Sequence, residues 1–296
     1  MSSQVDTLTR INLDDLVSSF GWQNKPLPAA LLRGLFIGPA RKFARQIVEY
    51  DNLVGQVGLN EASCQFLQTH YIHDLRVHGK EHVPASGPIL VLSNHPGMTD
   101  TVSLFAAIDR ADLRIIAMHR PFLASLFNIT RRLSYISDEP SERMRAVRQI
   151  SSHLRAGGAA LTFPAGKIEP DPLVHSGALE SLHDWTDSSG NFLRFAPETK
   201  IVPVFVSGVV WERTERHWFT RIKKTCEDRE KLATSLQLLA MVAREARPTT
   251  VHVRFAKPIT MEEVGSTDSD CIHEVLMERM HALIRCQNDG DGESIL

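Results

Sequence analysis

The stretch ILVLSNHPGMTDTVSLFAAI, residues 89–108, joins a strand pattern to a helix pattern through a sharp turn. Its opening run is almost wholly apolar, as in a strand that is buried on both faces of a parallel sheet. The Asn-His-Pro-Gly turn does not extend a strand, and Thr99 or Asp100 is a good N-cap for a helix that runs through Ile108. The sequence therefore predicts a strand–turn–helix unit with His95 at the carboxyl end of the strand, where open α/β sheets carry their binding sites.

Short apolar runs and helices alternate along the rest of this region. The segment SERMRAVRQISSHLRAGG, residues 141–158, carries four apolar residues on one helical face. These are Met144, Val147, Ile150 and Leu154. Buried strands are expected at 88–93, 113–118, 159–163 and 201–206. The segment 251–259 alternates polar and apolar residues, as a half-exposed or edge strand would, and a last helix covers 270–286. This order predicts an α/β fold with a mostly parallel mixed sheet that is flanked by helices.

Residues 12–71 are predicted to be helical, with a break at Gly38-Pro39. We therefore expect two parts, an N-terminal helical region over residues 1–74 and an α/β domain over residues 75–296. The first part combines several arginines with large apolar side chains, either to pack on the α/β domain or to dip into an anionic membrane surface. The apolar residues in question are Leu31, Leu32, Leu35, Phe36 and Phe43.

Composition narrows the class of protein. With 296 residues, 43% of them hydrophobic, the chain is long enough to bury a large core. A net charge of −2 argues against a surface built to bind nucleic acid. The four cysteines are far apart and lack zinc-site spacing, which is typical of reduced thiols in the cytoplasm. The N-terminus is polar, and no apolar stretch approaches the ~20 residues of a membrane span. We expect a cytoplasmic protein that is soluble or peripheral on the cytoplasmic face of a membrane.

The pair His95 and Asp100 is the strongest candidate for catalysis. With His95 on the turn and Asp100 in the first turn of the helix, the carboxylate can fold back onto one imidazole nitrogen and leave the other as a base. A serine on a G-x-S-x-G elbow is absent from the sequence, so the nucleophile would be an alcohol of the substrate. The structural alternative is a loop histidine that only forms a hydrogen bond to Asp100.

Three motifs in order resemble one family. NHPGMTD, residues 94–100, is similar to the H-x-x-x-x-D signature of the phospholipid/glycerol acyltransferase family, which includes the 1-acylglycerol-3-phosphate acyltransferases. LTFPAGK, residues 161–167, is similar to that family's FPEG-type turn, and IVPVFV, residues 201–206, to its VPV strand. The resemblance covers roughly residues 75–260. It implies a fatty acyl donor on coenzyme A or acyl carrier protein, a lipid acceptor with a free hydroxyl, and no metal or prosthetic cofactor.

The resemblance also implies a set of residues that bind the substrate. These are Asn94, Gly97, Phe163, Pro164, Gly166, Lys167 and Arg132. Two positions depart from the family pattern, because Ala165 stands where glutamate is usual and Asp138 where an arginine is expected to grip an acceptor phosphate. Lys167 is the best replacement cation, since the amides of the turn and the lysine can together receive an anion. Alternatively, Gly166 only serves the turn and Lys167 is a solvated surface charge.

The remaining replacement cations are Arg131, Arg132 and Arg143, of which Arg132 is the weaker choice beside Lys167 because a solvated helix position explains it equally well. The departures favour a lysophospholipid or a less usual hydroxylated lipid as acceptor. We expect an acyltransferase of phospholipid biosynthesis that uses His95 as general base. Two alternatives remain, an acyl-thioester hydrolase that uses the same residues on water and a non-catalytic lipid-binding relative.

Overall fold

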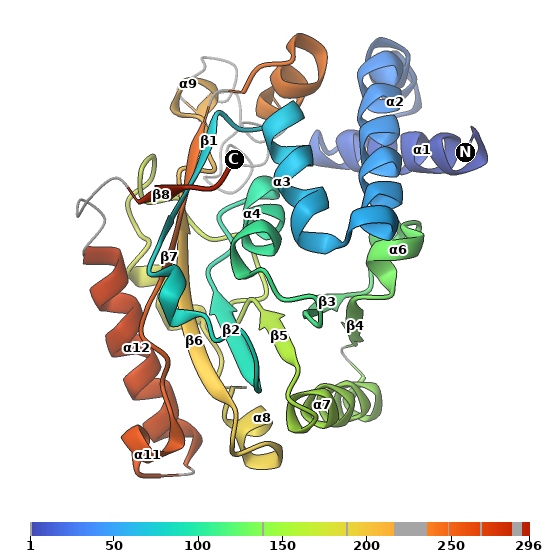
Figure 1. Cartoon of the computed structure of the whole chain (residues 1–296). Coiled ribbons are helices and arrows are strands. Elements are labelled where there is room, and N and C mark those ends of the chain that lie inside the picture. The colour runs from blue at the N-terminus through green and yellow to red at the C-terminus, as the bar shows by residue number, and fades with distance from the viewer. Residues whose placement is uncertain are drawn as a thin grey trace.

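The computed structural model describes residues 2–137, 139–187, 189–215, 236–247, 249–266, 268–285 and 292–296. Its centre is an eight-stranded sheet in the order β4-β3-β5-β2-β6-β7-β1-β8 (Figure 1). The strands are β1 (Asp74–His78), β2 (Ile89–Ser93), β3 (Arg114–Met118), β4 (Leu133–Ile136), β5 (Ala159–Thr162), β6 (Lys200–Ser207), β7 (Thr250–Phe255) and β8 (Glu293–Ser294). Neighbouring strands are parallel except at β6–β7 and β1–β8, so the predicted mostly parallel mixed sheet is confirmed.

Helices cover both faces of this sheet. The longer ones are α1 (Ser2–Ser19), α2 (Pro26–Val57), α3 (Leu59–His70), α4 (Met98–Ile108), α7 (Pro140–Arg155), α8 (Ser189–Phe195) and α12 (Ser269–Arg285), and residues 236–244 are also helical. Short turns of helix are α5 (Pro121–Ala124), α6 (Phe127–Thr130), α9 (Glu212–Glu215), α11 (Met261–Val264), η1 (Lys80–His82) and η2 (Glu180–Asp184). No helix in these described ranges is both long and apolar enough to cross a membrane.

The alternation of side chains along a strand explains the continuously apolar runs. In β2, Ile89 and Val91 join the core beneath α2, α3 and α4, whereas Leu90 and Leu92 join a second core beneath α7, α8 and α12. All four side chains are buried, because each face of the sheet has its own helical layer. The carboxyl end of β2, where His95 follows, thus lies in the middle of the sheet.

One strand prediction and one helix prediction need correction. The alternating segment at 251–259 becomes β7, which is not an edge strand but lies between β6 and β1. Its polar positions, such as Thr250 and His252, are half-buried, so the alternation reflects one partly covered face. In α7, Met144 was expected inward, but its side chain is 44% exposed and Ala146 is buried instead.

The N-terminal helices differ from prediction in their ends. Helix already begins at Ser2, and α2 continues through Pro39 instead of breaking there. The proline removes one backbone hydrogen bond, but buried Leu32 and Phe43 anchor the helix on either side, and packing outweighs local propensity. The expected boundary after residue 74 falls at the first residue of β1, and buried residues of α1, α2 and α3 share one core with the sheet.

The apolar residues of these helices divide between two environments. Leu32 and Phe43 are buried and Phe36 is half-buried. Leu31 and Leu35, in contrast, are 74% and 70% exposed, and Leu27, one turn earlier, is 83% exposed. The three exposed leucines follow one another at intervals of four residues and so form one stripe on α2.

Candidate active site

The predicted contact between His95 and Asp100 is present. His95 follows β2, and its Nδ1 lies 2.8 Å from Oδ2 of Asp100. Helix α4 begins at Met98 after Gly97, so neither Thr99 nor Asp100 is the N-cap that the sequence predicted. Asp100 instead lies in the first turn, where its side chain bends back and accepts the backbone N–H of Gly97 at 2.8 Å. Because this carboxylate folds toward the turn, a separation of five residues brings it onto the imidazole.

Asp100 is surrounded by hydrogen-bond donors. Besides His95 and Gly97, it accepts hydrogen bonds from the backbone N–H of Thr101 and from the Thr101 hydroxyl at 2.9 Å. All of these groups are donors, and the positive end of the α4 dipole adds to their effect. The residue is fully buried, so its orientation is fixed by these contacts.

The environment of His95 suits a base. Burial on its own lowers the pKa of His95, but the charge and hydrogen bond of Asp100, together with the charge of Glu169, outweigh it and raise the pKa above the ordinary value. The imidazole packs against the ring of Phe163 with 4.6 Å between ring centroids. Since Asp100 occupies Nδ1 and His95 lines a large cavity, Nε2 is the nitrogen available to a ligand there.

The cavity beside His95 has a volume of about 1030 Å³, the upper end of the ~300–1,000 Å³ range usual for small-molecule sites. It begins at the carboxyl ends of β2, β3 and β5 and reaches the C-terminal half of α2. Its wall on α2 and α3 is apolar and aromatic, and includes Phe43, Ile47, Tyr50, Phe66 and Leu67. The Tyr50 hydroxyl is bonded to Ser63 at 2.7 Å, so this wall presents little unsatisfied polarity. Such a wall accepts a long apolar chain.

The FPAG turn forms the other side of the cavity mouth. Phe163, Pro164 and Gly166, all predicted substrate residues, line the cavity. The N–H of Gly166 donates to the carbonyl of Phe163 at 3.0 Å, and Gly166 has a φ of 63°, which a glycine adopts without strain. The turn role of Gly166 thus has direct geometric support.

Four other predicted residues lie elsewhere. The Asn94 amide is buried and bonds both backbone groups of Val206, which ties the end of β2 to β6. Gly97 lines a much smaller hollow on the other side of the turn.

Lys167 forms an exposed ion pair with Asp184 at 2.9 Å, and Arg132 donates to the carbonyl of Ala111. Neither cation lines the large cavity. Asp138 lies outside the described residues.

Three residues of this site were missed or undervalued in the sequence. Arg120, after β3, and Arg143, on α7, line the cavity and bring positive charge to it. Glu169 is 2% exposed and accepts the backbone N–H of His95 at 3.0 Å. The only signal for Glu169 in the sequence was the presence of an acidic residue shortly after the FPAG turn.

Across the described parts of the chain, no group of three His, Cys, Asp or Glu side chains is placed to hold a metal ion.

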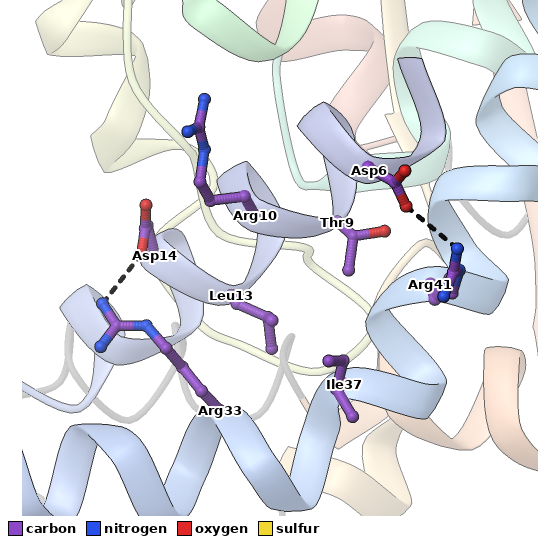
Figure 2. A pocket seen from close by; sticks show the side chains of 8 residues that line it. All are labelled: Asp6, Thr9, Arg10, Leu13, Asp14, Arg33, Ile37 and Arg41. Carbon is purple, nitrogen blue, oxygen red and sulfur yellow. Dashed lines mark hydrogen bonds and ion pairs between the residues drawn. The ribbon is translucent and has the colours of Figure 1, made fainter. Parts of the chain in front are cut away.

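A second hollow, of about 240 Å³, lies between α1 and α2 (Figure 2). Ion pairs cross it from Arg33 to Asp14 at 2.9 Å and from Arg41 to Asp6 at 3.0 Å. These side chains are about half exposed, and such pairs contribute only about 0–1 kcal/mol each. None of the residues that line the hollow belongs to the three motifs, so we interpret it as a gap in the packing interface between α1 and α2.

Comparison with known proteins agrees with the motifs. Residues 74–207, just under half of the chain, match the family model described as Acyltransferase. No curated protein matches the chain. Among solved structures, it is similar to the crystal structure of the 1-acyl-sn-glycerophosphate (LPA) acyltransferase, PlsC, from Thermotoga maritima. The identity is 17%, the match covers 85% of this chain and 83% of that chain, and the TM-score is 0.44. The matched segment contains the His95–Asp100 pair and the FPAG turn, so the resemblance seen in the sequence is confirmed: residues 74–207 match the model of the acyltransferase family.

Proposed function

We propose that the protein transfers a fatty acyl group from a thioester donor, on coenzyme A or acyl carrier protein, to a hydroxyl of a lysophospholipid or related glycerolipid. The observation that carries this proposal is the position of His95. It is paired through Nδ1 with a buried carboxylate and borders a cavity with a long apolar wall. A base at the mouth of an apolar chamber is suited to a substrate with an acyl chain and a polar reacting end.

The proposed reaction requires no group other than His95 as proton carrier. Nε2 takes the proton of the acceptor hydroxyl as its oxygen attacks the thioester carbonyl. Asp100 stabilises the imidazolium that forms. Collapse of the tetrahedral intermediate breaks the carbon–sulfur bond, and the thiolate leaves with the proton from Nε2. Base catalysis of this kind contributes about 10²–10⁴-fold, and orientation of the two substrates adds to it. No metal or prosthetic group takes part.

The cations of the cavity favour an acceptor with an anionic headgroup. Arg143 and Arg120 line the cavity, whereas Lys167 is paired with Asp184 on the surface. We therefore expect Arg143→Ala to raise KM for an anionic lysolipid about tenfold, with little effect on an uncharged hydroxylated lipid. Lys167→Ala is the matched control and should change KM less than about twofold. Equal effects of the two variants would contradict this assignment.

A membrane-bound substrate suits the exposed stripe of α2. Leu27, Leu31 and Leu35 are each at least 70% exposed, on the N-terminal half of the helix whose C-terminal half lines the cavity. We propose that this stripe holds the protein peripherally on the cytoplasmic face of a membrane.

The test is acyl transfer by the purified protein and its His95→Ala variant. Long-chain acyl-CoA and an acyl carrier protein thioester serve as donors, with a panel of lysolipids and hydroxylated lipids as acceptors, and products are identified by mass spectrometry. The proposal predicts an acylated lipid that forms only with His95 in place. Free fatty acid formed at the same rate with and without acceptor would indicate the hydrolase. No turnover of any donor would favour the lipid-binding relative.

A further inference from the structure

Glu169 and His95 are bonded to each other through two hydrogen bonds. The backbone N–H of His95 donates to Oε2 of Glu169 at 3.0 Å, and the backbone N–H of Glu169 donates to the carbonyl of His95 at 2.9 Å. This pairing joins the turn after β2 to the segment that follows the FPAG turn. The two sides of the cavity mouth are therefore held together at the residue that we propose as the base.

The second oxygen of Glu169 is anchored to a different element. Oε1 accepts the indole N–H of Trp185 at 2.8 Å. The hydroxyl of Ser181 lies 3.2 Å from Oε1 and shares its one hydrogen between Oε1 and the carbonyl of Ala178 at 2.9 Å. Ser181 belongs to η2 and Trp185 directly follows it, and Trp185 is buried. All of these contacts offer hydrogens to the carboxylate, which only an ionised side chain or its near equivalent accepts in full.

We propose that Glu169 is a positioning residue for His95, which fixes the backbone of the base and adds a second negative charge near its imidazole. This rests on the proposed function only in taking His95 as the base. Glu169 does not line the cavity, so it acts through His95 and not on the substrate.

The charges around His95 support this role. Burial raises the pKa of Glu169 to about 6, while the hydrogen bonds from Trp185, His95 and Ser181 and the charge of His95 act against that rise. Above that pH Glu169 carries its charge, and this charge helps to raise the pKa of His95. The other groups that contact the pair are Asp100 from α4, the uncharged Ser181 from η2 and the uncharged Trp185 directly after η2. The neighbouring Lys167–Asp184 pair is about half exposed and so is screened by water.

A purely structural carboxylate would behave differently. Asp171, two residues later, is also buried and accepts the backbone N–H groups of Gly208, Val209 and Val210, far in sequence from His95. Replacement of such a residue should lower the melting temperature and leave the pKa of His95 unchanged. Replacement of Glu169, as proposed, should also change the pKa of His95.

The experiment is an NMR titration of histidine side chains in the full-length protein labelled with ¹³C at the imidazole. The His95 signal is assigned by its loss in His95→Gln. In Glu169→Gln, which keeps the shape but removes the charge, the pKa of His95 should fall by about 0.5–1 unit. The matched control is Asp184→Asn, which removes an exposed carboxylate from η2, the short helix that contains Ser181. In this control the pKa of His95 should shift by about 0.1 unit or less. A folded Glu169→Gln protein whose His95 titrates as in the wild type would overturn the proposal.

A second variant covers the case in which Glu169→Gln does not fold. Trp185→Phe keeps an aromatic ring but removes the donor to Oε1, so Glu169 holds its proton to higher pH and the pKa of His95 should fall by a smaller amount. No shift in that variant would equally overturn the proposal. The NMR readout needs no substrate, so it stands even if the proposed acyl transfer fails. Where transfer is observed, kcat of Glu169→Gln should fall about tenfold with KM for the donor nearly unchanged, since the loss is one of orientation.

Discussion

Replacement of Asp100 by asparagine tests the proposed dyad most specifically, because it preserves shape and removes charge. Oδ2 of Asp100 accepts both His95 Nδ1–H and the Gly97 N–H, and the other oxygen accepts two donors of Thr101. An amide has only one oxygen. Whichever way the asparagine side chain turns, its NH₂ group faces one backbone N–H, that of Gly97 or that of Thr101, which has lost its acceptor.

The size of the effect follows from these contacts. A buried donor left without an acceptor costs about 1–3 kcal/mol, so Asp100→Asn should lower the free energy of unfolding by about 1–3 kcal/mol. In the reaction, the imidazolium loses its charged partner and His95 loses its fixed tautomer. A loss of about 3–5 kcal/mol of transition-state stabilisation corresponds to about 10²–10⁴-fold in rate.

The assay is thiol release from the acyl donor in the presence of acceptor, with a thermal melt to show that the variant is folded at the assay temperature. Asp112→Asn is the control, because Asp112 pairs with Arg110, and neither residue lines the cavity. We expect the control to retain activity within about twofold. Folded Asp100→Asn protein with more than about a tenth of the wild-type rate would refute the proposed role of this carboxylate.

Three further results are expected. Because the base must be neutral and Asp100 and Glu169 raise the pKa of His95, kcat/KM should fall as the pH is lowered, with a midpoint above the ordinary imidazole value of about 6.5; a midpoint below 6.5 in a pH–rate profile would contradict this. Ile47→Phe adds bulk to the apolar wall and should shift the preference in kcat/KM toward shorter acyl donors, whereas an unchanged chain-length profile would show that the chain binds elsewhere. Leu31→Glu combined with Leu35→Glu removes two exposed leucines, and burial of each leucine side chain contributes about 1.5–3 kcal/mol. Binding to anionic vesicles in a sedimentation assay should therefore weaken at least tenfold, while the melting temperature stays constant. Unchanged vesicle binding would exclude the stripe as the membrane contact.

The sequence was informative where burial left a simple pattern. Strands β2, β3, β5 and β6 were located to within a residue or so because both faces of the sheet are covered and the strand interiors are apolar. β1, β4 and β8 were missed, since they are short and carry polar residues. Pro39 was misinterpreted because its position within a packed helix depends on contacts that no local pattern records.

The site was predictable to the extent that its residues are close in sequence. His95 and Asp100 lie five residues apart, and Phe163, Pro164 and Gly166 form one turn, so motif and local geometry were sufficient. Lys167 directly follows the FPAG turn and Arg132 directly precedes β4, but neither lines the cavity, whereas Arg143 reaches it from α7. The direction of a long side chain depends on tertiary packing. Glu169 was missed for the same reason, because its partners His95, Ser181 and Trp185 come from separate segments.

The most direct test of the central claim is the intact mass of the protein after incubation with long-chain acyl-CoA alone, recorded together with thiol release. If His95 acts as a base on the hydroxyl of the acceptor, the protein should keep its unmodified mass, and thiol should appear only when a lipid acceptor is added. An acyl adduct on the protein, or a stoichiometric burst of thiol without acceptor, would contradict this account.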